Sequence, residues 1–103
     1  MTNTLMTPQI FKYSFTETVL MSDVEATFVL AVIAMEALYG ESETRLFAEH
    51  AMDLTAHTCV IDASTDLGRD LNCLFVVFLI REYGPDSFCM ERVATDAALT
   101  PSN

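Results

Sequence analysis

The fold of this chain is decided by residues 26–35, Ala-Thr-Phe-Val-Leu-Ala-Val-Ile-Ala-Met, and by residues 74–80, Leu-Phe-Val-Val-Phe-Leu-Ile. Each run lies within a longer stretch, Asp23–Tyr39 or Thr65–Tyr83, that is followed by glycine, a residue that commonly ends helices. A helix on the surface of a monomer carries one apolar stripe and one polar face, but these two stretches are apolar almost all the way round. The sequence therefore predicts two helices that need more cover than a single sheet provides.

The segments around these helices have the patterns of strands. Side chains alternate between apolar and polar from Ile10 to Thr16, and Thr58–Ala63 is rich in β-branched residues. Arg45–Met52 and Phe88–Val93 complete a predicted set of four strands. The chain order is then β-α-β-β-α-β, and right-handed crossovers place both helices on one side. We expect an α+β fold, a two-layer sandwich of the ferredoxin-like type with a four-stranded antiparallel sheet and two helices on one face.

At 103 residues the chain is long enough to form one domain without metal or disulfide support. We predict a single α+β domain over residues 10–94, between a flexible N-terminus (1–9) and a loose C-terminal tail (95–103). The three cysteines are widely spaced and form no C-x-x-C pair. Neither apolar run reaches the roughly 18 residues of a membrane span, and the start lacks a secretory signal pattern. These features predict a cytoplasmic protein with reduced thiols.

The charge of the chain is strongly negative, with 15 acidic residues against 5 Lys and Arg and a net charge of −10. Proteins neutralise the phosphates of nucleic acids with Lys and Arg, and anionic membranes attract the same residues. We therefore expect neither nucleic acid nor membrane as a partner. One explanation of the negative charge is that it keeps an apolar protein soluble. An alternative is that the acidic surface is a decoy that docks a basic partner.

The best candidate for a ligand site is the polar segment that leads from the third predicted strand into the second helix. Backbone N–H groups at a helix start can bind an anion, and a nearby arginine can assist. The acidic residues of the same segment would repel an anion, and ordinary helix capping explains its Ser and Thr without a ligand. The motif G-x-S-x-G is absent, so no catalytic residue is assigned and an enzyme is the less favoured alternative. The candidate ligand-binding residues are Asp62, Ser64, Thr65, Asp66 and Arg69.

A weaker candidate lies around the hairpin predicted between the second and third strands. His50, Asp53 and His57 are residue types that bind zinc, but their spacing matches no recognised zinc motif. We therefore expect no metal and no cofactor.

The helices themselves carry the main functional hypothesis. The predicted core stripes are Val24, Phe28, Ala31, Met35 and Leu38 on the first helix, and Leu67, Leu71, Leu74 and Phe78 on the second. These stripes leave apolar residues on the outer sides, and contiguous exposed apolar surface marks interaction sites. One interpretation is a wide stripe buried entirely between the helices and the sheet. We favour a homodimer or another protein partner, with an oligomer interface that contains Val29, Ile33, Val76 and Ile80.

Three segments of the chain, Cys59–Asp70, Arg81–Gly84 and Glu91–Val93, resemble a group of small bacterial proteins of unassigned function. The resemblance covers roughly the second half of the chain and includes no catalytic motif. It implies a bacterial, cytosolic origin and nothing about activity. The leading hypothesis from the sequence is a non-enzymatic interaction module.

Overall fold

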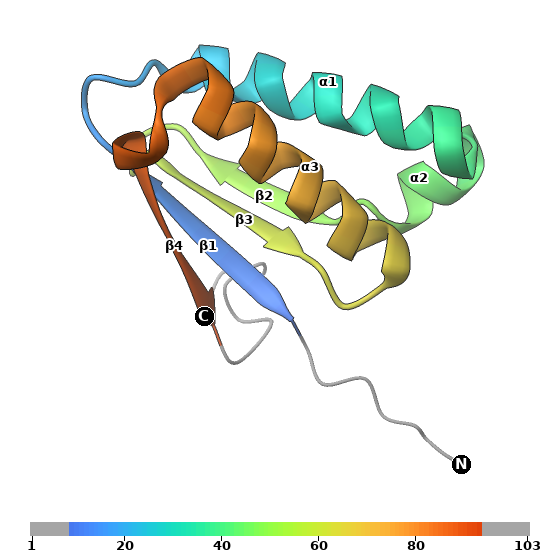
Figure 1. Ribbon diagram of the computed structural model, residues 1–103. Helices are drawn as coiled ribbons and strands as arrows, with labels where there is room; N and C mark the ends of the chain where they lie inside the picture. The colour runs from blue at the N-terminus through green and yellow to red at the C-terminus, as the bar shows by residue number, and fades with distance from the viewer. Residues whose placement is uncertain (1–8, 94–103) are drawn as a thin grey trace.

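The computed structural model describes residues 9–93, which form four strands, three α-helices and one 3₁₀ turn (Figure 1). The predicted flexible N-terminus, apart from Gln9, and the predicted C-terminal tail lie outside the described residues. In chain order the elements are β1 (Ile10–Phe15), α1 (Met21–Tyr39), α2 (Glu41–Phe47), β2 (His50–Asp53), β3 (Thr58–Asp62), α3 (Asp66–Tyr83), the 3₁₀ turn η1 (Pro85–Ser87) and β4 (Phe88–Val93).

The four strands form one sheet in the order β2-β3-β1-β4, and every neighbouring pair is antiparallel. The central strand β1 places Tyr13 opposite Cys59 of β3 and Met90 of β4. Helices α1 and α3 lie beside each other over one face of this sheet (Figure 1). The predicted α+β class and the four-stranded antiparallel sheet are therefore confirmed.

The prediction of two helices was wrong, because residues 41–47 form a third helix, α2. The strand predicted over Arg45–Met52 is reduced to β2, which begins only at His50. Local interactions explain the helix: Arg45 pairs with Glu41 one turn earlier at 2.6 Å, and the Thr44 hydroxyl donates to the Gly40 carbonyl at 2.7 Å. Glu41 and Glu43 also suit the positive end of the helix dipole.

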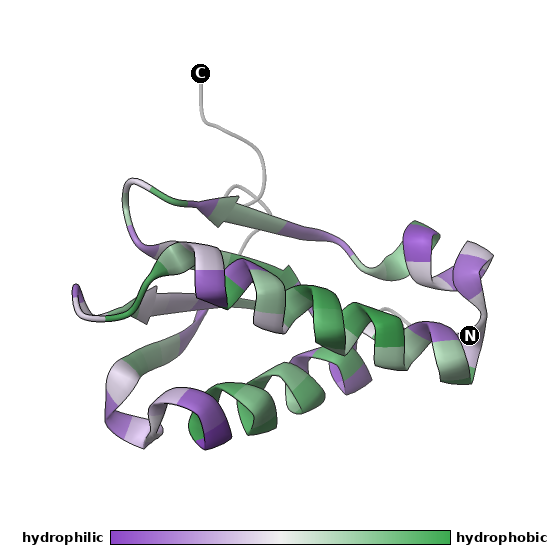
Figure 2. Ribbon diagram, turned by 90° about the horizontal axis from the view of Figure 1, so that it is seen from above, coloured by the Kyte–Doolittle hydropathy of each residue, from purple (hydrophilic) through white to green (hydrophobic). Residues whose placement is uncertain are grey.

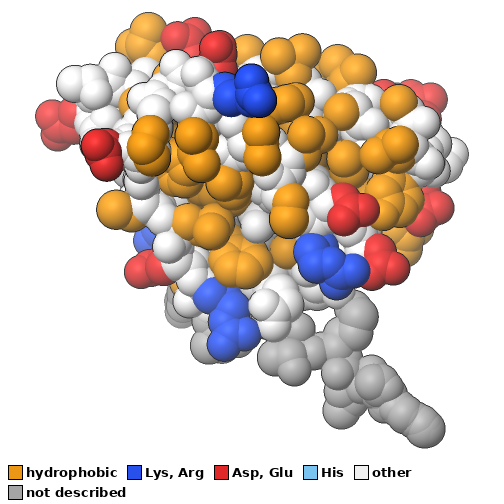
Figure 3. Space-filling model, viewed as in Figure 1, with side chains coloured by type: hydrophobic (Ala, Val, Ile, Leu, Met, Phe, Trp, Pro, Cys, Tyr) orange, Lys and Arg blue, Asp and Glu red, His pale blue; other side chains and the backbone are white. Residues whose placement is uncertain are grey.

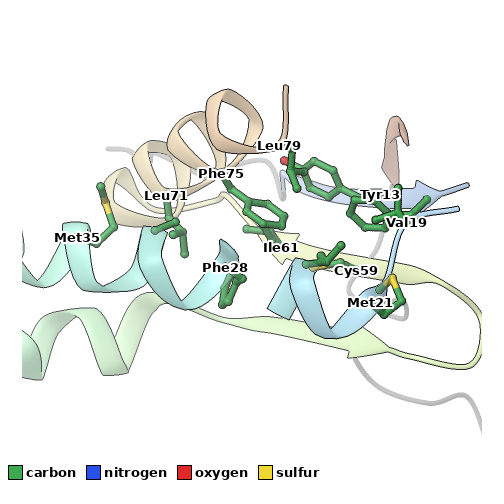
Figure 4. Packing of buried hydrophobic residues seen from close by; sticks show 13 residues of the cluster. Tyr13, Val19, Met21, Phe28, Met35, Cys59, Ile61, Leu71, Phe75 and Leu79 are labelled. Carbon is green, nitrogen blue, oxygen red and sulfur yellow. The ribbon is translucent and has the colours of Figure 1, made fainter. Parts of the chain in front are cut away.

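The core lies between the sheet and the two long helices (Figure 4). The ring of Phe75 on α3 meets Tyr13 of β1 and Phe28 of α1 edge-on, each with ring centroids 5.3 Å apart. Edge-to-face pairs of this kind stabilise a fold by about 0.5–1.5 kcal/mol beyond the area they bury. Three elements are therefore joined around a single aromatic side chain.

The buried stripes of the helices agree with the predicted ones only in part. On α1, four of the five predicted residues are buried, but Leu38, in the last turn, is 73% exposed. On α3, Leu67 and Leu71 are buried as predicted. The next buried apolar residues are Phe75 and Leu79, at four-residue steps, so the predicted Leu74 and Phe78 are only partly buried.

Candidate functional site

The outer side of the helical layer is apolar across both long helices. We call this the outer helical surface and define it by Val29, Leu30 and Ile33 on α1 and by Val77 and Ile80 on α3. All five side chains are exposed, with exposed fractions from 42% for Ile80 to 59% for Leu30. Both helices are hydrophobic along their middle turns (Figure 2), and hydrophobic side chains gather over α1 and α3 in the space-filling view (Figure 3).

Three of the four predicted interface residues, Val29, Ile33 and Ile80, are exposed on this surface. Val76 is not, because it is partly buried and packs against the core. Its place on the helix explains the difference. It lies one turn from Asn72 and Leu79, two buried residues, and so flanks the stripe that faces the sheet. Val77, the next residue, takes the exposed position instead.

A groove of about 450 Å³ runs between α1 and α3 and is lined by Thr27, Leu30, Phe78, Arg81 and Glu82. The hydroxyls of Thr27 and Tyr83 lie 3.2 Å apart, which ties α1 to the end of α3. Within residues 9–93, Arg81 has no acidic partner at ion-pair distance. The groove therefore adds an apolar hollow, with an unpaired cation at its rim, to the outer helical surface.

The charges of α3 are separated along the helix. Asp66 and Asp70 lie in its first two turns, whereas Arg81 lies in its last turn. Asp66 pairs with Arg69 at 2.5 Å, and Asp70 accepts a 2.6 Å hydrogen bond from the Tyr39 hydroxyl of α1. This hydrogen bond raises the pKa of Tyr39, since the carboxylate holds the phenolic proton. On the line of exposed residues Asp66, Asp70, Cys73, Val77 and Arg81, α3 thus has an acidic beginning, an uncharged middle and a basic end. Two further exposed charges, Arg69 and Glu82, lie outside this line.

The predicted ligand residues at the turn between β3 and α3 mostly contact one another. The Asp62 carboxylate accepts from the Ser64 N–H at 2.9 Å, and the Thr65 hydroxyl caps α3 by accepting from the Gly68 N–H at 3.0 Å. Asp66 is occupied by its ion pair with Arg69. Turn formation and capping therefore account for Asp62 and Thr65, and the ion pair accounts for Asp66 and Arg69. The Ser64 hydroxyl accepts a hydrogen bond from the Gln9 N–H at 2.9 Å.

Gly68 lets α3 begin close against β3. A Cβ at this position would overlap the carbonyl oxygen of Asp62 and would lie 3.1 Å from the Thr65 hydroxyl oxygen. Only a glycine avoids this overlap, so the close packing of helix and strand depends on it.

Beside this turn is a pocket of about 470 Å³, lined by Gln9, Phe11, Ala63, Ser64, Arg69, Asn72 and Cys73. It brings together two of the predicted ligand residues, Ser64 and Arg69, with Asn72 and Cys73, which the sequence analysis missed. Asn72 is only 7% exposed, and its side-chain oxygen accepts a hydrogen bond from the Tyr13 hydroxyl. Burial raises the pKa of Tyr13 well above its usual range, so this hydroxyl stays neutral and donates. The signal for Asn72 was an amide within a strongly apolar helix.

His50, Asp53 and His57 do not form a joint site. His50 packs its ring on Phe28, with centroids 4.3 Å apart, and so faces the helices. The Asp53 carboxylate accepts from the Ala56 N–H at 2.9 Å within the hairpin. His57 has a left-handed backbone with φ of 58° at the end of the same turn. In the described part of the chain, no three His, Cys, Asp or Glu side chains are grouped as metal ligands would be.

No family model, curated protein or solved structure matches this chain. Across residues 9–93, no helix combines the length and the apolar character that crossing a membrane requires. The two features that can carry a function are the outer helical surface and the pocket beside the β3–α3 turn.

Proposed function

We propose that this protein is a non-enzymatic interaction module that self-associates through the outer helical surface. The observation that carries the proposal is the exposure of five large apolar side chains on two neighbouring helices. Monomeric proteins rarely expose a contiguous apolar surface unless it is used for binding. A second copy of the chain supplies a surface of the same apolar character, as a symmetric dimer requires.

The size of the surface agrees with a dimer of moderate affinity. Helices of 19 and 18 residues are each about 27 Å long, and neighbouring helices lie about 10 Å apart. The two together cover roughly 540 Å² per copy, so two copies bury roughly 1,100 Å². Specific interfaces begin near about 1,000 Å². Interfaces of this small size occur in weak and transient complexes, so we expect a dissociation constant on the order of micromolar.

The finer description of the fold and location belongs to the same proposal. The sandwich is of the ferredoxin-like type, with α2 and η1 added to the order β-α-β-β-α-β. This fold type is supported by the position of α1 and α3 on one face of an antiparallel sheet. The protein works in the cytoplasm, where thiols stay reduced; the support is that Cys59, Cys73 and Cys89 are all free. The fold type by itself implies no activity.

A pair of matched substitutions tests the proposal. Ile33 on α1 and Leu54 in the β2–β3 hairpin are similarly exposed, at 53% and 50%, and replacement by Glu adds the same charge to each. We expect Ile33→Glu to convert the dimer to a monomer and Leu54→Glu to leave it intact, as measured by size exclusion with light scattering. Circular dichroism checks that both variants fold. A monomeric wild type, or equal behaviour of the two variants, contradicts the proposal.

A second candidate function is the binding of a small ligand in the pocket beside the β3–α3 turn. Its volume of about 470 Å³ lies within the range of about 300–1,000 Å³ that small-molecule sites occupy. Asn72 and Ser64 offer hydrogen bonds there, while Arg69 is already paired with Asp66. The fitting ligand is a small, neutral, polar molecule. Native mass spectrometry of the purified protein should then show a bound mass that Asn72→Ala and Ser64→Ala lose, and an unmodified chain mass contradicts this candidate.

A further inference from the structure

We propose that in the self-associated form α3 pairs antiparallel with α3 of a second copy, with Cys73 beside the two-fold axis and Arg81 beside the acidic first turns of the partner's helix. This inference rests on the proposed self-association and names its geometry. The occupant of the outer helical surface is therefore a second copy of this chain.

The first support is the spacing of the exposed residues of α3. Asp66, Asp70, Cys73, Val77 and Arg81 are all exposed and follow one another at steps of three or four residues. Such steps keep side chains on one line of a helix, which is how paired helices contact each other. The middle of this line, Cys73 and Val77, is uncharged, so it can be buried in a contact between two copies.

The second support is the direction of the charges along that line. A parallel pairing would bring the two copies of Asp66 and Asp70 together at one end and the two copies of Arg81 together at the other. An antiparallel pairing brings each Arg81 to the acidic end of the other helix, and opposite charges across an interface fix its register. Within residues 9–93, Arg81 has no ion-pair partner. Asp66 is paired with Arg69 of its own helix, so Asp70 is the acidic group that Arg81 of the other copy meets.

The other helix cannot provide the same complementarity. No Lys or Arg occurs between Lys12 and Arg45, so α1 carries Asp23, Glu25 and Glu36 without a base. Pairing α1 with α1 of a second copy would bring only like charges together, in a chain whose net charge is already −10. The charge pattern therefore selects α3 to set the register of the contact, and α1 contributes its exposed apolar residues Val29, Leu30 and Ile33 beside it.

The register follows from the helix rise of about 1.5 Å per residue. If Arg81 lies opposite Asp66 or Asp70 of the partner, the two-fold axis passes beside residues 73–76. Cys73 is then within about 4 Å of the axis, measured along the helix. The two Cys73 thiols of a dimer are thus within reach of one short crosslinker.

The cysteines of this chain make a direct test possible. Cys59 is buried, whereas Cys73 and Cys89 are exposed. Cys89 pairs in register with Ser14, so it lies on the sheet face away from the helices. With a short bismaleimide we expect a covalent dimer from the wild type and from Cys89→Ser, and none from Cys73→Ser. Crosslinking that depends on Cys89 instead would overturn the proposed geometry.

Charge exchange provides an independent test of orientation. Arg81→Glu should weaken the dimer about tenfold or more, because an attraction becomes a repulsion at two symmetric contacts. Asp70→Arg should weaken it similarly, and the double variant Asp70→Arg with Arg81→Glu should recover most of the affinity. Arg92→Glu, an exposed change of the same charge on β4, is the matched control and should have no effect. Asp70→Arg also removes the hydrogen bond that Tyr39 donates to Asp70, so Tyr39→Phe measures the effect of that loss on dimer affinity separately.

The outcomes separate the two proposals. In one outcome the wild type dimerises and Ile33→Glu abolishes the dimer, but the double variant Asp70→Arg with Arg81→Glu does not recover dimer affinity. The antiparallel pairing of α3 is then wrong, and self-association stands. If the wild type shows no dimer at any concentration, both proposals fall together.

Discussion

Replacement of Gly68 by Ala tests the close packing of α3 on β3. In an exposed helix, Gly→Ala stabilises a protein by about 1 kcal/mol, because alanine has the higher helix propensity. Here the added Cβ would overlap the Asp62 carbonyl oxygen, which belongs to the backbone and cannot rotate away. The first turn of α3 must therefore move away from the sheet, and the Thr65 hydroxyl, 3.0 Å from the Gly68 N–H, loses its capping geometry.

The expected size follows from three contributions. Overpacking of a tight contact costs about 1–3 kcal/mol, the weakened cap costs up to about 1 kcal/mol, and helix propensity returns about 1 kcal/mol. We expect Gly68→Ala to lower the free energy of unfolding by about 2 kcal/mol, a change of opposite sign to the propensity effect alone.

Urea denaturation followed by circular dichroism measures this change. Cys89→Ala is the control, since Cys89 is exposed on the sheet face away from the helices and its replacement should alter stability by no more than about 0.5 kcal/mol. Both variants are compared with the wild type at one protein concentration. If Gly68→Ala is as stable as the wild type or more stable, α3 does not begin as close to β3 as described, and the account of the turn is refuted.

Two further predictions concern the buried polar groups. Burial raises the pKa of the Cys59 thiol to about 12 from 9.0, and it also raises the pKa of Tyr13 above 10.0, so both groups stabilise the fold only while they are neutral. Below pH 9 these groups should not affect the free energy of unfolding, and towards pH 12 it should fall by up to about 1.4 kcal/mol per pH unit and group. In urea denaturation, the stability of Cys59→Ala should fall less steeply with pH than that of the wild type. An unchanged slope would contradict the raised pKa of Cys59. Tyr13→Phe removes the donor to Asn72 and leaves a buried oxygen unpaired, which should cost about 1–3 kcal/mol. In calorimetry, Tyr13→Phe combined with Asn72→Ala should cost less than the sum of the single changes, and simple additivity would show that the pair does not interact.

Much of the architecture was predictable from local patterns. The last strand was predicted as Phe88–Val93 and has those bounds, and α3 begins within one residue of its prediction. These segments were predictable because periodicity and end signals agree in them. Residues 41–52 were not, since residues 41–47 form a short helix in a segment whose apolar residues suggested a strand, and the exposed ion pair between Glu41 and Arg45 supports that helix only weakly.

The candidate site was predictable to a smaller extent. The exposure of Val29 and Ile33 followed from a helix that is apolar all round, because one sheet can cover only one side. The position of Val76 did not follow, since a shift of one residue decides whether a side chain faces outwards or flanks the core. The pocket beside the β3–α3 turn brings Gln9 and Phe11 together with Asn72 and Cys73, and no local pattern reveals a contact over such a distance in the sequence.

Sedimentation equilibrium of the unaltered chain tests the central proposal of self-association most directly. Over protein concentrations from about 1 to about 100 µM, which bracket a micromolar dissociation constant, the mean mass should rise from the 11.4 kDa of one chain towards twice that value. The rise should fit a reversible equilibrium between one and two copies. A mass that stays at 11.4 kDa over the whole range would contradict self-association through the outer helical surface.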